Sequence, residues 1–296
     1  MISAYGISLG AKQRLFPYQA AITSALEISD EYCIVYDPRF DDINIFQTIS
    51  DRVIPIEYHY DFMEWDFINT ALTKARQSCS GDWCLYLELD EVLHEKDKDV
   101  YLEAIEFANI NRINTISIPY LDIRGNYYKI FGTRQKLIRN ISNVIHKTSD
   151  YMIGTCDSKV WNGKYILPGF DDVSYYDTNT KAWYNDPNAL TMGNTIDKPF
   201  IWHYAWYDLE RKHKQGGQNR MWQWRTYNIS TETYNISTEY DEEKLIESFK
   251  EQIVLQNFEY YNDIEMQDFI RLPFNHPKYV FDWIKEIDKN ASTSCS

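Results

Sequence analysis

Short apolar runs alternate with stretches of helical periodicity along the first part of the chain. The runs have the length of buried strands, and the stretches between them repeat apolar residues every three to four positions. Strands are expected at residues 2–8, 32–36, 52–58, 83–88 and 115–123. Helices are expected at residues 17–28, 42–50, 67–80 and 98–110. This alternation predicts an α/β fold with a mostly parallel central sheet and helices on both faces.

Prolines and glycines mark several of the expected boundaries. Pro17 opens the first helix, because proline fits the first turn of a helix. Pro55 indicates a strand that is bent or lies at the edge of the sheet. Gly81 follows the helix expected at 67–80 and is expected to cap its C-terminus.

The pattern changes after residue 125. Residues 127–140 suggest paired short strands around Gly132, and residues 144–200 look irregular, with short clusters of Gly, Asp, Asn and Pro. Two further helices are expected at 242–261 and 276–287, and the tail from residue 288 is expected to fray.

The charge balance limits the classes of partner. With 30 basic and 44 acidic residues the formal net charge is −14, which argues against nucleic acid or an anionic membrane as the main partner. The sequence contains no run of about 18 apolar residues, so no membrane-spanning helix is expected. The N-terminus reads as a strand and not as a signal peptide. The five cysteines contain no Cys-x-x-Cys pair, which is typical of a reduced compartment. A soluble, cytoplasmic protein is expected, in the host cytoplasm if the chain is viral.

Carboxylates gather directly after two of the expected strands. One strand is followed by Asp37, Asp41 and Asp42, and the other by Glu88, Asp90 and Glu91. Ligands of parallel α/β sheets bind at the carboxyl ends of the strands. An extended backbone would place Glu88 and Asp90 on one side, where two carboxylates repel unless a cation or a proton lies between them. Carboxylate oxygens suit Mg²⁺ or Mn²⁺, which can hold a diphosphate.

A structural role is the alternative for part of this cluster. Acidic side chains are favoured in the first turn of a helix, so Glu91 and Glu95 could cap the helix that follows.

The segment GDWCLYLELDEVLHE, residues 81–95, resembles the sugar-nucleotide motif region of GT-A glycosyltransferases, particularly the family 2-like group. Those enzymes commonly show a strand followed by Asp-x-Asp or a relative, and here the motif is Glu-x-Asp-Glu. The resemblance covers roughly residues 1–125. It implies a GT-A (Rossmann-like) fold and an enzyme that moves a sugar from a nucleoside-diphosphate sugar to an acceptor hydroxyl, with Mn²⁺ or Mg²⁺ and with inversion. The partners implied are the nucleotide-sugar donor and a glycan or other hydroxyl acceptor.

The same resemblance suggests roles for individual residues. The metal ligands would be Glu88, Asp90 and His203, the last from the segment FIWHYAWYDLERKHKQ at 200–215. Donor contacts would come, besides Glu88 and Asp90, from Asp37, Asp42, Asn69, Arg134 and Lys212. For His203 the alternative is a structural histidine that is hydrogen-bonded among aromatic residues. For Arg134 and Lys212 the alternative is a basic side chain on a solvated surface.

Inverting transfer also needs a general base that takes the proton of the acceptor hydroxyl. Asp122, Asp150, Asp171 and Asp172 are candidates, and the pair Asp171 and Asp172 in the loop-like segment PGFDDVSYYD is preferred.

Three parts are expected along the chain. Residues 1–125 form the nucleotide-sugar-binding half, 126–215 the acceptor-side half of the catalytic domain, and 216–296 a C-terminal helical extension. Two other functions stay open. One is a catalytically inactive GT-A-like protein that binds carbohydrate or serves as a scaffold. The other is a metal-dependent phosphoryl-transfer enzyme or nuclease, although the chain lacks GxxxxGK[ST].

Overall fold

The structure is a computed structural model that describes residues 1–61, 67–110, 115–140, 199–205, 207, 270–273 and 275–293. It also gives the backbone of six short strands between residues 144 and 191. The amphipathic helix expected at 242–261 lies outside the described residues.

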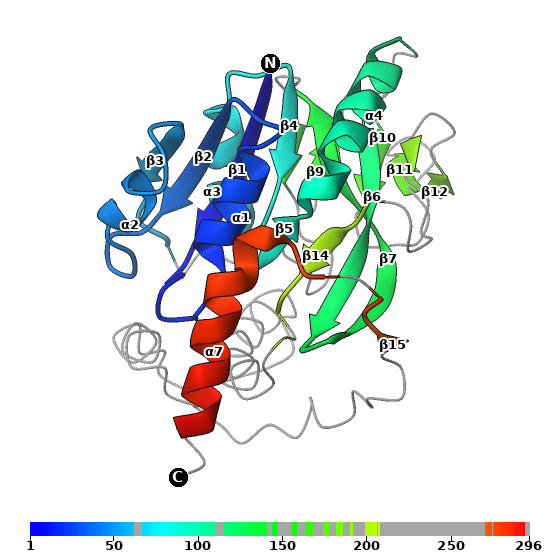
Figure 1. Cartoon of the computed structure of the whole chain (residues 1–296). Coiled ribbons are helices and arrows are strands. Elements are labelled where there is room, and N and C mark those ends of the chain that lie inside the picture. The colour runs from blue at the N-terminus through cyan, green and yellow to red at the C-terminus, as the bar shows by residue number, and fades with distance from the viewer. Residues whose placement is uncertain are drawn as a thin grey trace, which may run out of the picture.

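A ten-stranded mixed sheet forms the centre of the described chain (Figure 1). The order along its main path is β3-β2-β1-β4-β7-β6-β14-β5. The bounds are β1 Ile2–Ser8, β2 Glu31–Tyr36, β3 Val53–Glu57, β4 Trp83–Tyr86, β5 Glu91–Leu93, β6 Thr115–Arg124, β7 Tyr127–Arg139 and β14 Ile201–His203. Strands β3, β2, β1 and β4 are all parallel, whereas β7 is antiparallel to both β4 and β6. The predicted α/β class is confirmed, and Pro55 lies on the edge strand β3 as expected.

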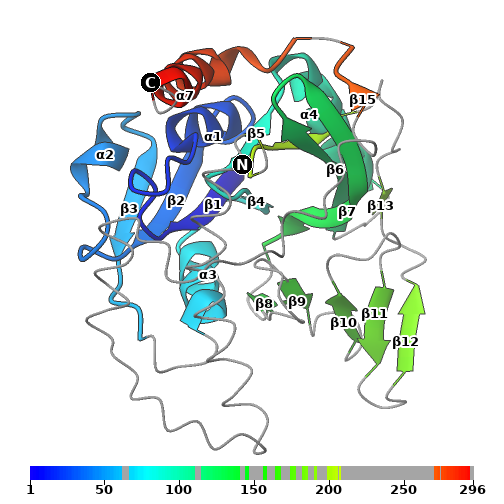
Figure 2. The same cartoon turned by 90° about the horizontal axis from the view of Figure 1, so that it is seen from below.

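Alternate side chains of the parallel strands enter two hydrophobic layers, as the period of a strand requires. On β2, Tyr32 and Ile34 enter one layer, and Cys33 and Val35 enter the other. The first layer is covered by α1 (Tyr18–Ala25), α2 (Asn44–Gln47) and α4 (Lys98–Ile110), and the second by α3 (Phe67–Gln77). Figure 2 shows α1 and α3 on opposite faces of the sheet. The prediction of helices on both faces is confirmed.

Gly6 allows a side chain of β2 to reach the backbone just before the acidic turn that follows β4. A Cβ atom at Gly6 would lie 2.6 Å from the hydroxyl oxygen of Tyr32 and 2.7 Å from the carbonyl oxygen of Leu87. That hydroxyl donates a buried hydrogen bond to the same carbonyl, at 2.7 Å. Glycine is therefore required here by close approach, and the residue before Glu88 is tied to β2.

Two expected boundaries around residue 80 were wrong. Helix α3 ends at Gln77, so Gly81 does not cap it. Gly81 instead lies against β1, where its N–H donates to the Ser3 hydroxyl at 2.7 Å and a Cβ would be 2.6 Å from the Ser3 nitrogen. Strand β4 ends at Tyr86, two residues before the expected end, because the chain turns there.

The paired strands expected around Gly132 are one long strand of a hairpin. Strands β6 and β7 pair antiparallel along their length, and the turn between them contains Gly125 at φ +54°. Glycine adopts this left-handed conformation without a Cβ clash. The glycine that breaks the pattern is therefore Gly125, and β7 continues through Gly132.

The region expected to be irregular contains six short strands. They are β8 Val144–His146, β9 Cys156–Ser158, β10 Lys164–Leu167, β11 Ser174–Asp177, β12 Ala182–Asn185 and β13 Leu190–Thr191. Strands β10, β11 and β12 form an antiparallel sheet, β8 pairs with β9, and β13 pairs with β6. Aromatic and β-branched residues between the turn clusters favour strands in this region.

The described C-terminal residues return to the central sheet. Strand β15 (Ile270–Arg271) pairs with β7, and the short η4 (Lys278–Val280) leads into helix α7 (Phe281–Thr293). Trp283 packs in the cluster that contains Trp202 and Tyr204, and its Nε1 donates to the carbonyl oxygen of Leu15 at 2.9 Å. The helix expected at 276–287 is present, but it begins at Phe281 and extends to Thr293, so most of the tail expected to fray is helical. The division into three parts stays a prediction.

Replacing Asp97 by asparagine is expected to stabilise the protein at neutral pH. Asp97 lies in the short helix η1 (Glu95–Asp97), is 5% exposed, and its Oδ2 has no hydrogen-bond partner among the described residues. Burial raises the pKa of this carboxyl to about 6. Because the folded state holds the proton more tightly, stability falls as the pH rises from about 4 to about 6, by up to about 2 kcal/mol from this group.

Asp97→Asn should therefore be more stable than the parent chain at pH 7 and about equal to it at pH 4. Urea unfolding at the two pH values measures this, with Asp99→Asn on the exposed start of α4 as the control. A variant that is no more stable at pH 7 would contradict the assignment.

Candidate functional site

The predicted acidic motif lies in a tight turn after β4. The backbone N–H of Glu91 donates to the Glu88 carbonyl at 3.0 Å, and the N–H of Glu88 donates to Oε2 of Glu91 at 2.8 Å. The extended alternation expected for Glu88 and Asp90 is therefore wrong, because the backbone turns between β4 and β5. The capping role considered for Glu91 is also wrong, since Glu91 begins β5. Glu95 does lie in the first turn of η1.

Asp90 and His203 are brought together across this turn. The backbone N–H of Tyr204 donates to the Asp90 carbonyl at 2.7 Å, and β14 pairs with β5. As a result, Nε2 of His203 lies 3.8 Å from Oδ2 of Asp90. Asp90 is only 7% exposed, and the His203 side chain is 19% exposed.

Asp122 holds the other nitrogen of the same imidazole ring. Nδ1 of His203 lies 2.6 Å from Oδ1 of Asp122, and the two residues are direct partners in the parallel pairing of β14 with β6. Burial acts to lower the pKa of His203. The hydrogen bond and charge of Asp122, with the charges of Asp90 and Glu91, outweigh burial and raise the pKa above its ordinary value.

Glu88 has the pKa of a group that exchanges its proton near neutral pH. Burial raises the pKa of Glu88 to about 7, and the negative charge of Glu91 contributes in the same direction. The charge of Lys136 opposes both effects. Glu88 therefore differs from an exposed carboxyl, which is ionised throughout this range.

A buried ion pair that the sequence did not predict supports this turn. Nζ of Lys136 lies 2.7 Å and 2.9 Å from the two carboxylate oxygens of Glu91, and the Tyr120 hydroxyl donates to the same carboxylate. Glu91 is 0% and Lys136 1% exposed. The sequence contains no clear signal for this pair, because Lys136 directly follows the polar residues 133–135 and does not stand out as a buried lysine.

The sequence did not predict a role for Arg14 or for the loop after β1, which Asp41 holds in place. Asp41 accepts hydrogen bonds from the Ser8 hydroxyl and from the backbone N–H groups of Gly10 and Ala11. Arg14, 7% exposed, follows in the same loop. Burial lowers the pKa of Arg14 to about 10, while the charges of Asp90 and Asp41 act in the opposite direction. Arg14 therefore places a positive charge close to the acidic turn at neutral pH.

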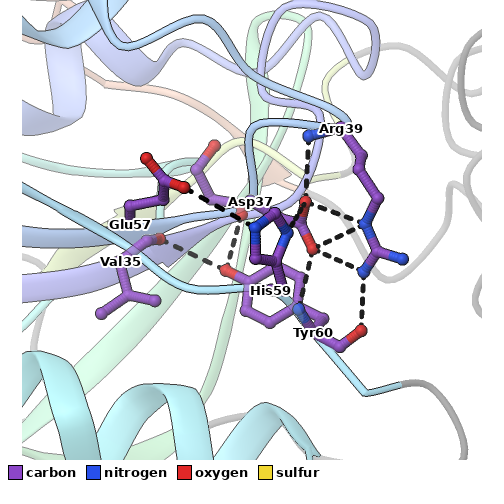
Figure 3. A network of polar contacts seen from close by, with 7 residues as sticks. Val35, Asp37, Arg39, Glu57, His59 and Tyr60 are labelled. Atoms are coloured by element: carbon purple, nitrogen blue, oxygen red, sulfur yellow. Dashed lines mark hydrogen bonds and ion pairs between the residues drawn. The ribbon is translucent and has the colours of Figure 1, made fainter.

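Asp37, a predicted donor contact, is at the centre of a polar network at the ends of β2 and β3 (Figure 3). Its fully buried carboxylate accepts from Nε and Nη2 of Arg39, at 3.0 Å and 2.6 Å, and from the backbone N–H of Tyr60 at 2.7 Å. His59 lies between Asp37 and Glu57, 3.7 Å and 3.6 Å from their oxygens. In the described chain Asp37 holds this loop in place, and its contact with a donor stays a prediction.

Of the other predicted residues, the structure describes the side chain of Asp42 alone. Asp42 is exposed and accepts hydrogen bonds from the backbone and side chain of Asn44 at the start of α2. Asn69 lies on α3 and Arg134 on β7, and only their backbones are described. Lys212, Asp171 and Asp172 lie outside the described residues.

The Asp90–His203 pair suits a divalent cation. With Nδ1 hydrogen-bonded to Asp122, a neutral ring presents the Nε2 lone pair to the carboxylate of Asp90. A separation of 3.8 Å is too long for a hydrogen bond. It is within the reach of two ligands that each lie about 2 Å from one ion. Within the described residues no group of three His, Cys, Asp or Glu side chains is arranged to hold a metal. The metal, and the part of Glu88 in binding it, stay predictions.

None of the described helices is both long enough and apolar enough to span a bilayer.

Searches against known proteins found similarity to solved structures and assigned no family. No family model and no curated protein matches the sequence. Among solved structures, Staphylococcus aureus TarS 1–349 in complex with UDP-GlcNAc is 10% identical, with a TM-score of 0.40, over 85% of this chain and 72% of that one. The same protein in complex with UDP is 12% identical, with a TM-score of 0.31, over 42% and 36% of the two chains.

A third similar structure is the bifunctional IspDF from Campylobacter jejuni. It is 10% identical, with a TM-score of 0.30, over 47% of this chain and 40% of that one. The chain therefore spans well under two thirds of the IspDF chain and of TarS in its UDP complex. At these values no family is assigned, and the function is argued from the residues of the chain itself.

Proposed function

We propose that the chain is a metal-dependent glycosyltransferase that moves a sugar from a nucleoside-diphosphate sugar to an acceptor hydroxyl, with inversion. The observation that supports this most directly is the pair formed by the buried Asp90 and the half-buried His203 at the carboxyl edge of the parallel strands. Parallel α/β sheets bind their ligands at that edge. A carboxylate and an imidazole together are good ligands for Mn²⁺.

The residues around the pair suit a diphosphate leaving group. Transfer breaks the bond between the anomeric carbon and a diphosphate oxygen, so negative charge develops on the diphosphate. A bound Mn²⁺ or Mg²⁺ ion would stabilise that charge as a Lewis acid. Arg14 is buried and interacts electrostatically with Asp90 and Asp41, so it would add a second fixed positive charge to the site.

The proposed general base for the acceptor lies outside the described residues. The acceptor hydroxyl forms the new bond to the anomeric carbon and gives its proton to a carboxylate. Asp171 and Asp172 stay the proposed base, and Lys212 and Arg134 stay proposed donor contacts. The cytoplasmic location expected from the sequence also stays a prediction.

Nucleotide binding is expected to raise the melting temperature only when a divalent metal is present. The panel is UDP, GDP, CDP and dTDP, each with and without Mn²⁺. UDP is tried first because similar structures hold UDP and UDP-GlcNAc. A ligand at 100 times its Kd stabilises by about 2.7 kcal/mol, which corresponds to roughly 5–10 °C for a chain of this size.

The control variant is Asp90→Asn, which should lose the Mn²⁺-dependent part of the rise. If no nucleotide raises the melting temperature of the folded protein, the result would contradict the proposal and favour an inactive GT-A-like module. If a nucleotide binds, hydrolysis of its sugar conjugate in the presence of Mn²⁺ separates an enzyme from such a module.

A further inference from the structure

The proposed reaction assigns no role to Asp122, yet this residue makes one of the shortest polar contacts of the site. Its Oδ1 lies 2.6 Å from Nδ1 of His203. The side chain is 12% exposed, against 19% for the His203 ring, so little water competes for this hydrogen bond.

The contact is built into the sheet and not into a loop. Asp122 and His203 are register partners of the neighbouring parallel strands β6 and β14. β6 is also paired with β7, where Asp122 faces Lys129. β14 is in turn paired with β5, where His203 faces Glu91. Strand pairs on both sides therefore fix the spacing between the carboxylate and the ring.

A carboxylate at Nδ1 decides which nitrogen of a neutral imidazole carries the proton. An ionised carboxylate only accepts hydrogen bonds, so Nδ1 must be the donor, and Nε2 is left with its lone pair. That lone pair is directed at the Asp90 side, where Oδ2 lies 3.8 Å from Nε2. The opposite tautomer would place two acceptors against each other at the 2.6 Å contact.

We propose that Asp122 is a positioning residue: it fixes the ring of His203 in the Nδ1–H tautomer and aims the Nε2 lone pair at the cation-binding position beside Asp90. This inference rests on the proposed function for the cation, but the tautomer is a property of the chain alone.

The tautomer can be measured without metal or donor. Long-range ¹H–¹⁵N spectra of protein with labelled histidine, recorded over a rising pH series until the signals report a neutral ring, distinguish protonated from unprotonated ring nitrogens. His203→Gln identifies the His203 signals among the six histidines. The parent chain should show a protonated Nδ1 and an unprotonated Nε2. In Asp122→Asn the amide can either donate to Nδ1 or accept from it, so a mixture of tautomers is expected.

Mn²⁺ binding then tests the consequence for the site. Loss of an orienting carboxylate typically weakens metal affinity 10–100-fold. Asp122→Asn and Asp122→Ala should show this loss in a titration followed by the electron paramagnetic resonance of free Mn²⁺, whereas the exposed Asp99→Asn should bind like the parent chain.

The outcomes separate the two proposals. An Nε2–H tautomer in the parent chain, or an Asp122→Asn variant that keeps both the parent tautomer and the parent Mn²⁺ affinity, would overturn the role of Asp122 and leave the proposed function standing. The Nδ1–H tautomer in a parent chain that binds no Mn²⁺ would support the orienting contact and overturn the metal in the proposed function.

Discussion

Replacing Asp90 by alanine is expected to lower the rate of metal-dependent sugar transfer by roughly 10²–10³-fold, the size of effect seen when one group that stabilises transition-state charge is removed. The Asp90 side chain supplies one of the two metal-ligand atoms of the Asp90–His203 pair, and without it the pair offers His203 alone. The turn itself should survive, because the hydrogen bond from Tyr204 is to the backbone carbonyl of Asp90. The measurement is transfer, or donor hydrolysis without acceptor, at several Mn²⁺ concentrations.

Two comparisons make this result specific to the site. Asp51→Ala removes an exposed aspartate in the turn before β3 and should leave the rate unchanged. Far-ultraviolet circular dichroism and the melting temperature of Asp90→Ala establish that the variant is folded. Full metal-dependent activity in folded Asp90→Ala would refute the assignment of this residue.

Replacing Lys136 by methionine is expected to cost about 3–5 kcal/mol of the free energy of unfolding. The change keeps most of the side-chain volume beside the rings of Tyr86 and Tyr120, over which the ammonium group lies at 4.2 Å and 5.1 Å. It leaves the fully buried carboxylate of Glu91 without its cation. Urea unfolding should show a lower midpoint with little change in the slope.

The matched control is Lys285→Met, since Lys285 also forms a lysine–carboxylate pair, with Asp282 at 2.9 Å. The side chains of Lys285 and Asp282 are 75% and 96% exposed, so the loss in the free energy of unfolding should stay below about 1 kcal/mol. A second test is the double variant Glu91→Gln with Lys136→Met, which removes both charges and should recover part of the stability. If Lys136→Met loses no more than Lys285→Met, the buried pair does not support the turn.

The local pattern was sufficient for the architecture of the first half. Strand β1 and helix α4 have the bounds that the periodicity predicts, and the edge position of Pro55 also follows from chemistry within the strand. Boundaries were less secure where glycines were interpreted by local rules. Gly81 fits against β1, and its role depends on a partner far away in sequence.

The sequence by itself determined that acidic residues follow two of the parallel strands. Because the carboxyl ends of parallel strands meet at one edge of a sheet, the site could be predicted at that edge. It did not determine which side chains pair. The contact between Asp122 and His203 spans 81 residues, and that between Glu91 and Lys136 spans 45. Both depend on the order and register of β5, β6, β7 and β14. Hydrophobic periodicity shows that a strand is buried, but burial is equally satisfied by many strand orders. Only the folded sheet decides which charged groups meet in its interior.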